Sequence, residues 1–317
     1  MVTGSAMPLS EDVRRELAGV VPLKHCDRLA ELSGLFHTAG SLHLRGHGEF
    51  SVHLDLAESA VARRAVGLVR SFGVEAEIRT YTRHAFERGT RYQLHLPGEP
   101  RALEVLNEAG VLSSAHAPLE APPKRVVGRS CCRRAYLRGA LLGGGSVSGP
   151  RAAHLEIRTA SRAGAELLAW VAAQEDVQLR VLDRSRHAIA YAKGAEPIAD
   201  ILALAGAGDA ALSIDEHAVV AEARARANRI ANADHANLVR ASRAAYAQVQ
   251  AIRRLEEDGA LGRLSPGLRE IAELRLRHPS LSLRELAAKC RPPATKAAAH
   301  RRLRKLVNLA EHDFQRT

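Results

Sequence analysis

The sequence predicts an α+β fold in which two αββαββα repeats form one pseudo-two-fold platform, followed by an all-α connector and a helical C-terminal domain. Three observations favour this fold. Residues 26–42 and 131–147 of the 317-residue chain align at a constant offset of 105 residues. Apolar residues alternate along short segments downstream of each copy, as in half-buried strands. Beyond residue 214 the alternation gives way to apolar residues at helical spacing.

Each repeat is expected to run helix, strand, strand, helix, strand, strand, helix. The first strands alternate at Val52 and Leu54 in one copy and at Leu155 and Ile157 in the other. Helices are expected over 59–71 and 161–175. Two strands follow each helix, and the second of them spans 91–96 in the first copy and 187–192 in the other. The inward-facing residues that open these later strands are Val74, Ala76 and Ile78, and Val177, Leu179 and Val181. The last helix of each repeat has a proline near its start.

Two glycine-containing nonapeptides stand at corresponding places in the repeats. Residues 32–40 read LSGLFHTAG and residues 137–145 read LRGALLGGG, with glycine at the third and ninth positions of both. These segments resemble the LAGLIDADG signature of a family of homing endonucleases. The resemblance implies two helices packed side by side, with small residues that let their backbones approach closely. The alternative is a generic duplicated α/β domain that has a glycine in this helix.

The eighth position of each nonapeptide bears on the chemistry. The resemblance implies that, in the nucleases, an acidic residue at this eighth position holds the divalent metal that activates water. This chain has Ala39 and Gly144 instead, and neither can bind a metal. Because Mg²⁺ needs oxygen ligands, we expect no nuclease activity, no catalytic residue and no metal or cofactor.

Histidines and cysteines raise the alternative of a soft-metal site. His43, His47 and His53 lie close in sequence, but their alternation with apolar residues favours an outward position for His43 and His53 on a hairpin. The cysteines fit no CxxC spacing, and an adjacent pair is a poor geometry for a disulfide or a shared tetrahedral metal. We expect four reduced thiols: Cys26, Cys131, Cys132 and Cys290.

The outward strand face is the surface with which homing endonucleases cradle DNA. By strand parity this face carries charges of both signs, with some basic bias in the second repeat. A duplex-binding groove normally neutralises many phosphates with Lys and Arg. We therefore expect a weak DNA-binding surface at best, and a surface for a protein partner or a geometric support is at least as good an interpretation.

Charge is concentrated at the C-terminal end of the chain. The net charge is +11, and residues 259–317 hold 13 Lys and Arg against 5 Asp and Glu. This balance indicates a polyanionic partner, double-stranded DNA before a membrane surface, with a merely solubilising tail as the alternative. The sequence has no apolar run long enough to span a membrane and no apolar signal core near its start, so we expect a cytoplasmic, nucleoid-associated protein.

Residues 215–258 are helical in pattern. Val219, Val220, Ala223 and Ala227 form one apolar stripe. A second stripe comprises Ala245, Val249, Ile252 and Leu255. Between the stripes, asparagine and aspartate are dense over 228–237, which favours a break in the helix with Asp234 as a cap.

Residues 264–310 predict a helix-turn-helix. A first helix spans 266–277, a capping box at Ser282 and Glu285 opens a second, and Thr295 caps a third that ends near Leu309. In such modules the start of the last helix enters the major groove. A basic three-helix bundle that binds a protein is the alternative. The residues expected to contact DNA are Arg284, Lys289, Arg291, Thr295, Lys296, Ala297, His300, Arg301, Arg304 and Lys305.

A degenerate LAGLIDADG pair followed by this helix-turn-helix resembles the WhiA family of bacterial regulators, above all in residues 131–147, 228–238, 268–287 and 300–305. The resemblance implies a sequence-specific transcription regulator of sporulation septation, cell division or chromosome segregation, with a small iron–sulfur regulator as a possible protein partner. The alternatives are a metal-dependent LAGLIDADG endonuclease and a protein-interaction scaffold. The expected parts are an N-terminal segment (1–20), the first repeat (21–114), a linker (115–128), the second repeat (129–214), the connector (215–258) and the DNA-binding domain (259–317).

Overall fold

A computed structural model of the chain describes residues 9–44, 50–83, 89–149 and 153–313. The chain divides into two units, which we call the platform unit (Met1–Glu222) and the helix-turn-helix unit (Ala223–Thr317). Among the described helices none is long and apolar enough to cross a membrane.

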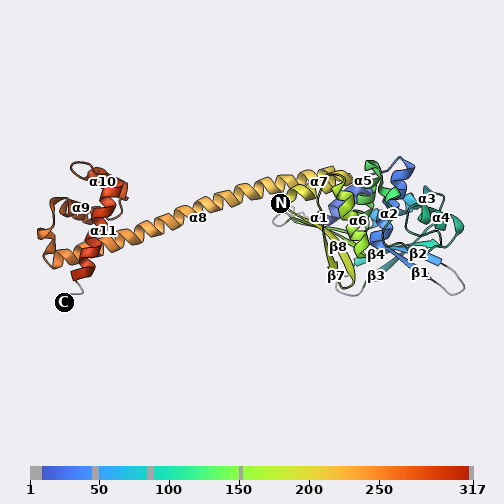
Figure 1. Cartoon of the computed structure of the whole chain (residues 1–317), viewed down its shortest axis with the longest axis horizontal. Helices are drawn as coiled ribbons and strands as arrows, with labels where there is room; N and C mark the ends of the chain where they lie inside the picture. Colours follow the sequence, from blue (N-terminus) through green and yellow to red (C-terminus); the bar gives the residue numbers. More distant parts are fainter. Residues whose placement is uncertain (1–8, 45–49, 84–88, 150–152, 314–317) are drawn as a thin grey trace, which may run out of the picture. The chain divides into compact units, whose positions relative to one another are not determined.

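The platform unit contains the duplicated αββαββα arrangement that the sequence predicts (Figure 1). The first repeat comprises α2 (His25–Ala39), β1 (Gly40–Leu44), β2 (Phe50–Leu56), α3 (Ser59–Arg70), β3 (Glu77–Arg83), β4 (Gly89–Pro97) and α4 (Pro100–Glu108). The second comprises α5 (Ser130–Gly144), β5 (Gly145–Ser148), β6 (His154–Thr159), α6 (Arg162–Ala173), β7 (Arg180–Arg184), β8 (His187–Lys193) and α7 (Ala195–Ala205). A short 3₁₀ turn, η2 (Lys124–Val127), lies between them.

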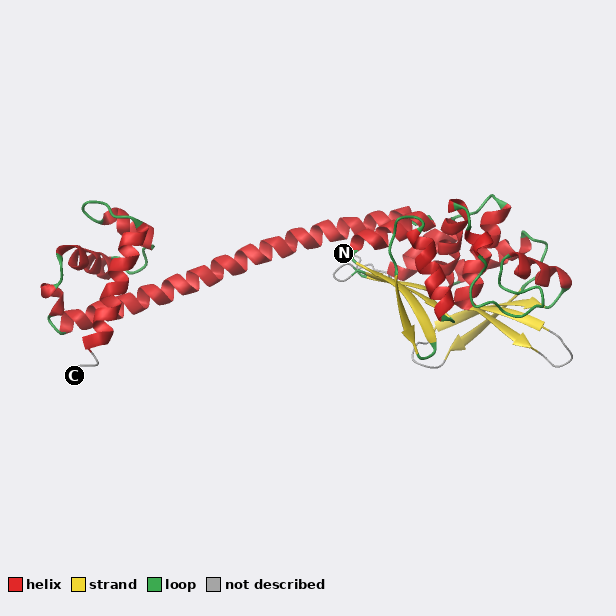
Figure 2. Cartoon of the chain, viewed as in Figure 1, coloured by secondary structure: helices red, strands yellow, loops and turns green. Residues whose placement is uncertain are grey.

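Each repeat forms a four-stranded antiparallel sheet, in the orders β1-β2-β4-β3 and β5-β6-β8-β7. Figure 2 shows the helices of the platform on one side of the sheets. Every second residue along the central strands points to that side, and those such as Leu54 and Ile157 are fully buried. The helices therefore cover one sheet face, and the opposite face is the outward one that the alternation predicts.

The third strand of each repeat begins later than expected. Val74 and Val177 are buried, but they precede β3 and β7. Ile78 lies opposite the buried Leu94 and therefore faces the helical side, as predicted, but it is 43% exposed. The exposure follows from the place of β3 at the edge of its sheet, where the helices cover the inward face less completely.

The two nonapeptide helices, α2 and α5, pack directly against each other through their third-position glycines. A Cβ on Gly34 would lie 2.7 Å from the backbone nitrogen of Ala140, and a Cβ on Gly139 would overlap the carbonyl of Glu31. Real Cβ atoms do not approach backbone so closely, so the helix contact needs glycine at both places. The predicted close approach is confirmed.

A buried charge network crosses this helix pair, and the sequence pattern did not reveal it. The Glu31 carboxylate accepts hydrogen bonds from Arg138 Nε at 2.8 Å and from Arg64 Nε at 2.7 Å. Arg138 Nη1 also donates to the carbonyl of Ala205 at 3.1 Å. Glu31 is fully buried, so α2, α3, α5 and α7 are joined through one desolvated carboxylate.

An additional helix, α1 (Leu9–Gly19), precedes the first repeat. Val13 and Leu17 bury one face of this helix in the platform core. The Ser10 hydroxyl donates to the carbonyl of Val147 and accepts from its amide, at 2.9 and 2.8 Å. The segment 1–20, for which no structure was predicted, thus includes a helix that packs into the core. This helix also provides a hydrogen-bond partner for the backbone amide and carbonyl of Val147 in β5.

Helix α8 (Gly208–Glu257) is continuous, so the predicted break at 228–237 was wrong (Figure 1). Every side chain from residue 228 to residue 237 is exposed, and solvated asparagines lose little by remaining helical in an alanine-rich stretch. Val219 and Val220 are 69% and 47% exposed, so the first apolar stripe does not form a packed face. The second stripe does, because Ile252 and Leu255 are buried.

Candidate nucleic-acid interface

The helix-turn-helix unit has its own apolar core. Helices α9 (Pro266–Arg277), α10 (Leu283–Lys289) and α11 (Lys296–Asp313) pack around it with the end of α8, after the 3₁₀ turn η3 (Ala260–Arg263). The three helices match the predicted ones, and α11 extends four residues beyond the expected end. The buried core residues are Ala251, Ile252, Leu255, Leu268, Ile271, Ala272, Leu286, Ala287, Cys290, Ala299, Leu303, Leu306 and Ala310.

A buried arginine fixes the connection between α9 and α10. Arg275 is 2% exposed, and its Nη1 donates to the carbonyls of Pro279 and Leu281 at 3.3 and 2.7 Å. Burial lowers the pKa of this guanidinium. Arg275 is one of the 13 Lys and Arg over residues 259–317, but this side chain holds a turn and does not contribute to the exposed basic surface. One signal in the sequence was available: Arg275 lies three residues after the buried Ala272, which places both residues on the same face of α9.

The predicted capping box at the start of α10 is confirmed. Ser282 Oγ accepts from the amide of Glu285 at 3.3 Å, and the Glu285 carboxylate accepts from the amide of Ser282 at 2.8 Å. These bonds from Ser282 lower the pKa of the Glu285 carboxyl. The box sets where α10 begins and therefore where its exposed Arg284 lies.

The turn between α10 and α11 is held by three local hydrogen bonds. The amide of Ala294 donates to the carbonyl of Ala287 at 2.9 Å, and the amide of Arg291 donates to Glu270 Oε1 at 2.5 Å. Thr295 Oγ1 accepts from the amide of Ala298 at 3.1 Å, so the predicted cap of the third helix is present.

All ten residues expected to contact DNA are exposed. On α11, residues 296, 300 and 304 form one i,i+4 row and residues 297, 301 and 305 the neighbouring row. These rows lie away from Leu303 and Leu306, which are buried in the core. Two adjacent rows on one helix therefore present most of the predicted residues to solvent together.

The cations on this surface are available for an external anion. Seven of the ten residues are Lys or Arg, and none of the seven forms an ion pair within the part of the chain that the structure describes. By contrast, Arg277 on α9 is paired with Glu273 at 2.8 Å. Unpaired cations on an exposed helix attract phosphate without first breaking an internal pair.

The platform lacks carboxylates where the nuclease signature has them. Ala39 and Gly144 occupy the eighth positions of α2 and α5. A Cβ on Gly144 would lie 2.5 Å from the carbonyl oxygen of Arg158 and 2.9 Å from Thr38 Cβ. The Arg158 backbone and the Thr38 side chain therefore leave no room for a side chain, acidic or otherwise, at position 144.

Among the described side chains on the outward face of the first sheet, most charges are paired with one another. Asp55 accepts from Tyr81 Oη at 2.9 Å and from Arg91 Nε at 3.2 Å, and Arg79 pairs with Glu77 at 3.0 Å. The second sheet is the more basic one. Its exposed arginines are Arg158, Arg180, Arg184 and Arg186.

His53 lies on the outward face, as strand parity predicts, but it is only 9% exposed. Its Nε2 is 3.1 Å from both Ser51 Oγ and His95 Nδ1, and the two imidazole rings meet edge to face. Neighbouring side chains on this face cover the ring. Of the other two histidines considered for a metal, His47 and the side chain of His43 lie outside the described residues.

Models of three domain families match the chain. The WhiA N-terminal LAGLIDADG-like domain matches residues 25–112, the WhiA LAGLIDADG-like domain matches 133–224, and the WhiA C-terminal HTH domain matches 227–310. These three matches follow the two repeats and the helix-turn-helix in chain order.

Curated relatives match over nearly the whole chain. A probable cell division protein WhiA of Symbiobacterium thermophilum is 38% identical over 307 residues, which cover 96% of this chain and 98% of the relative. The protein of the same name from Heliobacterium modesticaldum is 36% identical and covers 96% of each chain.

A solved structure has the same fold. The crystal structure of full-length DUF199/WhiA from Thermotoga maritima matches with a TM-score of 0.57 at 21% identity, over 96% of this chain and 98% of that one. At this identity the match supports the fold alone. The family models and the curated relatives together show that the chain belongs to the WhiA family.

Proposed function

We propose that the protein is a sequence-specific DNA-binding transcription regulator without enzymatic activity, and that α11 is its recognition helix. The observation that supports this most is the set of seven exposed, internally unpaired cations on and beside α10 and α11. A helix-turn-helix that presents such a set has the electrostatics that a phosphate backbone requires.

The proposed contacts divide by position along the helix-turn-helix. Thr295, Lys296, Ala297 and His300 lie at the start of α11, the part that reaches base edges in this type of module. Farther along α11 and on α10, the contacts are with phosphates, which position the protein without specifying sequence. The proposed phosphate contacts are Arg284, Lys289, Arg291, Arg301, Arg304 and Lys305.

We further propose that the platform does not cleave DNA. The absence of side-chain oxygens at Ala39 and Gly144 removes the ligands around which a two-metal hydrolysis is built. The competing function is a metal-dependent endonuclease that uses other acids. Incubation of supercoiled plasmid with the protein and Mg²⁺ or Mn²⁺ separates the two. Nicking or cutting that disappears when one acid near the helix pair is replaced would establish the nuclease.

The names of the curated relatives support a role in cell division. Within that role we propose sporulation septation and chromosome segregation as the regulated processes, and a cytoplasmic, nucleoid-associated location. A small iron–sulfur regulator is the proposed protein partner, with the outward strand face as its docking surface. Co-purification of such a partner with the intact protein, and its loss when the arginines of the second sheet are replaced, would test the surface.

Genome-wide mapping of binding sites in the encoding organism tests the function. The intact protein is expected to occupy a limited set of promoters, and Lys296→Ala with Arg304→Ala is expected to abolish that occupancy. Arg70→Ala is the matched control, because Arg70 is an exposed cation on the helical side of the platform. Equal occupancy by the double variant and the control would favour the scaffold interpretation.

A further inference from the structure

Three thiols and a carboxylate from the two repeats meet at the beginnings of α2 and α5. Cys26 and Asp27 lie in the first turn of α2, and Cys131 and Cys132 lie in the first turn of α5. The three sulfur atoms and one carboxylate oxygen all lie within 4.8 Å of one another. Within the described ranges, this is the group of potential metal ligands that the fold brings together.

Two ligand-to-ligand distances within this cluster are close to those of a tetrahedral zinc site, and all four ligand atoms lie within 4.8 Å of one another. Zn–S bonds of about 2.3 Å and Zn–O bonds of about 2.0 Å place neighbouring ligand atoms roughly 3.5–3.8 Å apart. In the structure Cys131 Sγ is 3.9 Å from Cys132 Sγ, and Cys26 Sγ is 3.5 Å from Asp27 Oδ1. Although adjacent cysteines are an unfavourable pair in general, here both sulfurs point to one place.

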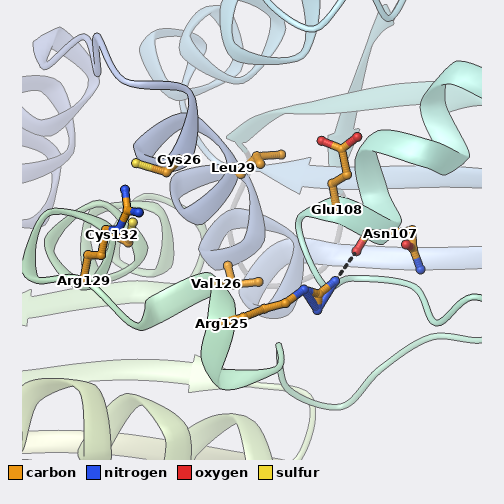
Figure 3. Close-up of a pocket in the computed structure, with 8 residues that line it drawn as sticks. All are labelled: Cys26, Leu29, Asn107, Glu108, Arg125, Val126, Arg129 and Cys132. Atoms are coloured by element: carbon orange, nitrogen blue, oxygen red, sulfur yellow. Dashed lines mark hydrogen bonds between the residues drawn. The ribbon is translucent and has the colours of Figure 1, made fainter.

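The surroundings suit an anionic ligand set. The first turn of a helix favours negative charge, and here two helices begin at the same place. A cavity of about 400 Å³ opens beside the cluster and is lined by Cys26, Cys132 and the guanidinium-bearing Arg129, among others (Figure 3). Three thiolates and one carboxylate around Zn²⁺ carry a net charge of −2, which Arg129 partly offsets. The cavity gives a cation access from solvent.

We propose that Cys26, Asp27, Cys131 and Cys132 form a binding site for a thiophilic divalent cation, Zn²⁺, that joins the starts of the two central helices. The site takes ligands from both repeats, so it is complete only when the platform is folded. Three sulfurs and one oxygen form a closed tetrahedral set of the kind found in structural zinc sites. A cation held there stabilises the α2–α5 pair, which is the centre of the platform.

Two of the thiols in the cluster, those of Cys131 and Cys132, have a raised pKa. A hydrogen bond to Asp27 and partial burial raise the pKa of Cys131, and burial raises the pKa of Cys132 to about 12. Because cysteine binds zinc as the thiolate, zinc binding releases thiol protons to solvent, and the apparent affinity strengthens as the pH rises.

Titration of the fully reduced, full-length protein with Co²⁺, followed by displacement with Zn²⁺, tests the site. The expected result is one cation per chain, a thiolate-to-cobalt charge-transfer band and the strong visible bands of tetrahedral cobalt. Cys26→Ser and Cys131→Ser are each expected to weaken binding by at least about 10–100-fold, since even loss of a supporting partner costs that much. Excess Zn²⁺ is expected to raise the melting temperature of the unmodified protein and not that of Cys26→Ser.

Cys290→Ser is the matched control. Cys290 is the fourth cysteine, it lies in the other unit, and its Sγ donates to the carbonyl of Leu286, a bond that serine can retain. This variant is expected to bind cobalt like the unmodified protein. The proposal is overturned if the reduced protein binds no cobalt, or if Cys26→Ser and Cys131→Ser both bind it undiminished. A disulfide within the cluster, without cation binding by the reduced form, would overturn it in favour of a redox role.

Discussion

Glu31 and Arg138 form a buried ion pair between the two central helices, with Arg138 Nη2 2.8 Å from Glu31 Oε2. Arg64 pairs with the other carboxylate oxygen. A single acid in α2 therefore pairs with cations from both α3 and α5, and all three side chains are almost completely buried. Removal of one member of such a buried network is strongly destabilising, because it leaves an uncompensated charge. Replacement of all its members by well-packed apolar residues costs little.

Replacing Glu31 alone is expected to destabilise the platform strongly. Glu31→Gln leaves two buried guanidinium groups without a counter-charge, which costs about 3–5 kcal/mol. Urea unfolding followed by circular dichroism measures the change. Asp12→Asn breaks the exposed pair with Arg15 and is the control, with an expected change below about 1 kcal/mol. A stable Glu31→Gln protein would show that the network contributes little.

Adding one methyl group at the helix contact is expected to be costly. Gly139→Ala places a Cβ against the carbonyl of Glu31, so the helices must separate, at about 1–3 kcal/mol. Gly67→Ala is the matched control, because Gly67 is also helical but has nothing within 4 Å of its Cβ position. That control is expected to be neutral or stabilising by up to about 1 kcal/mol. Equal melting temperatures for both variants would refute the close approach.

The stability of the platform is expected to fall as the pH drops below neutrality. Burial lowers the pKa of His37 from its ordinary 6.5, although its Nδ1–H donates to the carbonyl of Ser33 at 2.8 Å. The unfolded chain therefore takes up a proton that the folded chain refuses, so stability is full above pH 6.5 and is lost as the pH falls toward the folded pKa. His37→Gln should flatten this dependence in urea titrations from pH 7 to pH 5. The exposed His235→Gln should leave it unchanged, and an unaltered slope in His37→Gln would contradict the assignment.

The capping box is expected to contribute measurably to the helix-turn-helix unit. Ser282→Ala removes the acceptor for the Glu285 amide and should destabilise the unit by about 0.5–2 kcal/mol. Thermal unfolding reports the change. The neighbouring Ser280→Ala, at an exposed loop position, should have almost no effect, and a similar loss in both variants would assign the effect to the loop rather than to the cap.

Local signals in the sequence predicted much of this structure. The capping box at Ser282 and the cap at Thr295 depend on residues within a few positions of one another, whereas the repeats follow from self-similarity at an offset of 105 residues and the contact glycines from the resemblance to the LAGLIDADG signature. The boundaries of α9 follow from Pro266 and from the end of its apolar spacing. The caps and the boundaries of α9 are specified by periodicity or by a short-range hydrogen bond.

Features that depend on tertiary contacts were missed or wrong. The density of asparagine over residues 228–237 suggested a break in α8. These side chains are exposed to solvent instead, and the helix continues through them. The turn that Arg275 holds was not predicted, because its acceptors at Pro279 and Leu281 are backbone carbonyls beyond the end of the helix. The thiol cluster was hidden because a spacing test looks along one segment, whereas Cys26 and Cys131 correspond to each other across the repeats and meet only because their helices pair.

The salt dependence of DNA binding tests the central claim most directly. The affinity of the full-length protein for a promoter fragment is measured from low to high salt, and the logarithm of the affinity constant is plotted against the logarithm of the salt concentration. Arg304→Ala is expected to flatten the slope by roughly 0.9, and Arg301→Ala with Arg304→Ala by roughly 1.8. Arg70→Ala should retain the original slope. If neither α11 variant changes the slope or the affinity, α11 does not contact DNA and the proposed recognition helix is wrong.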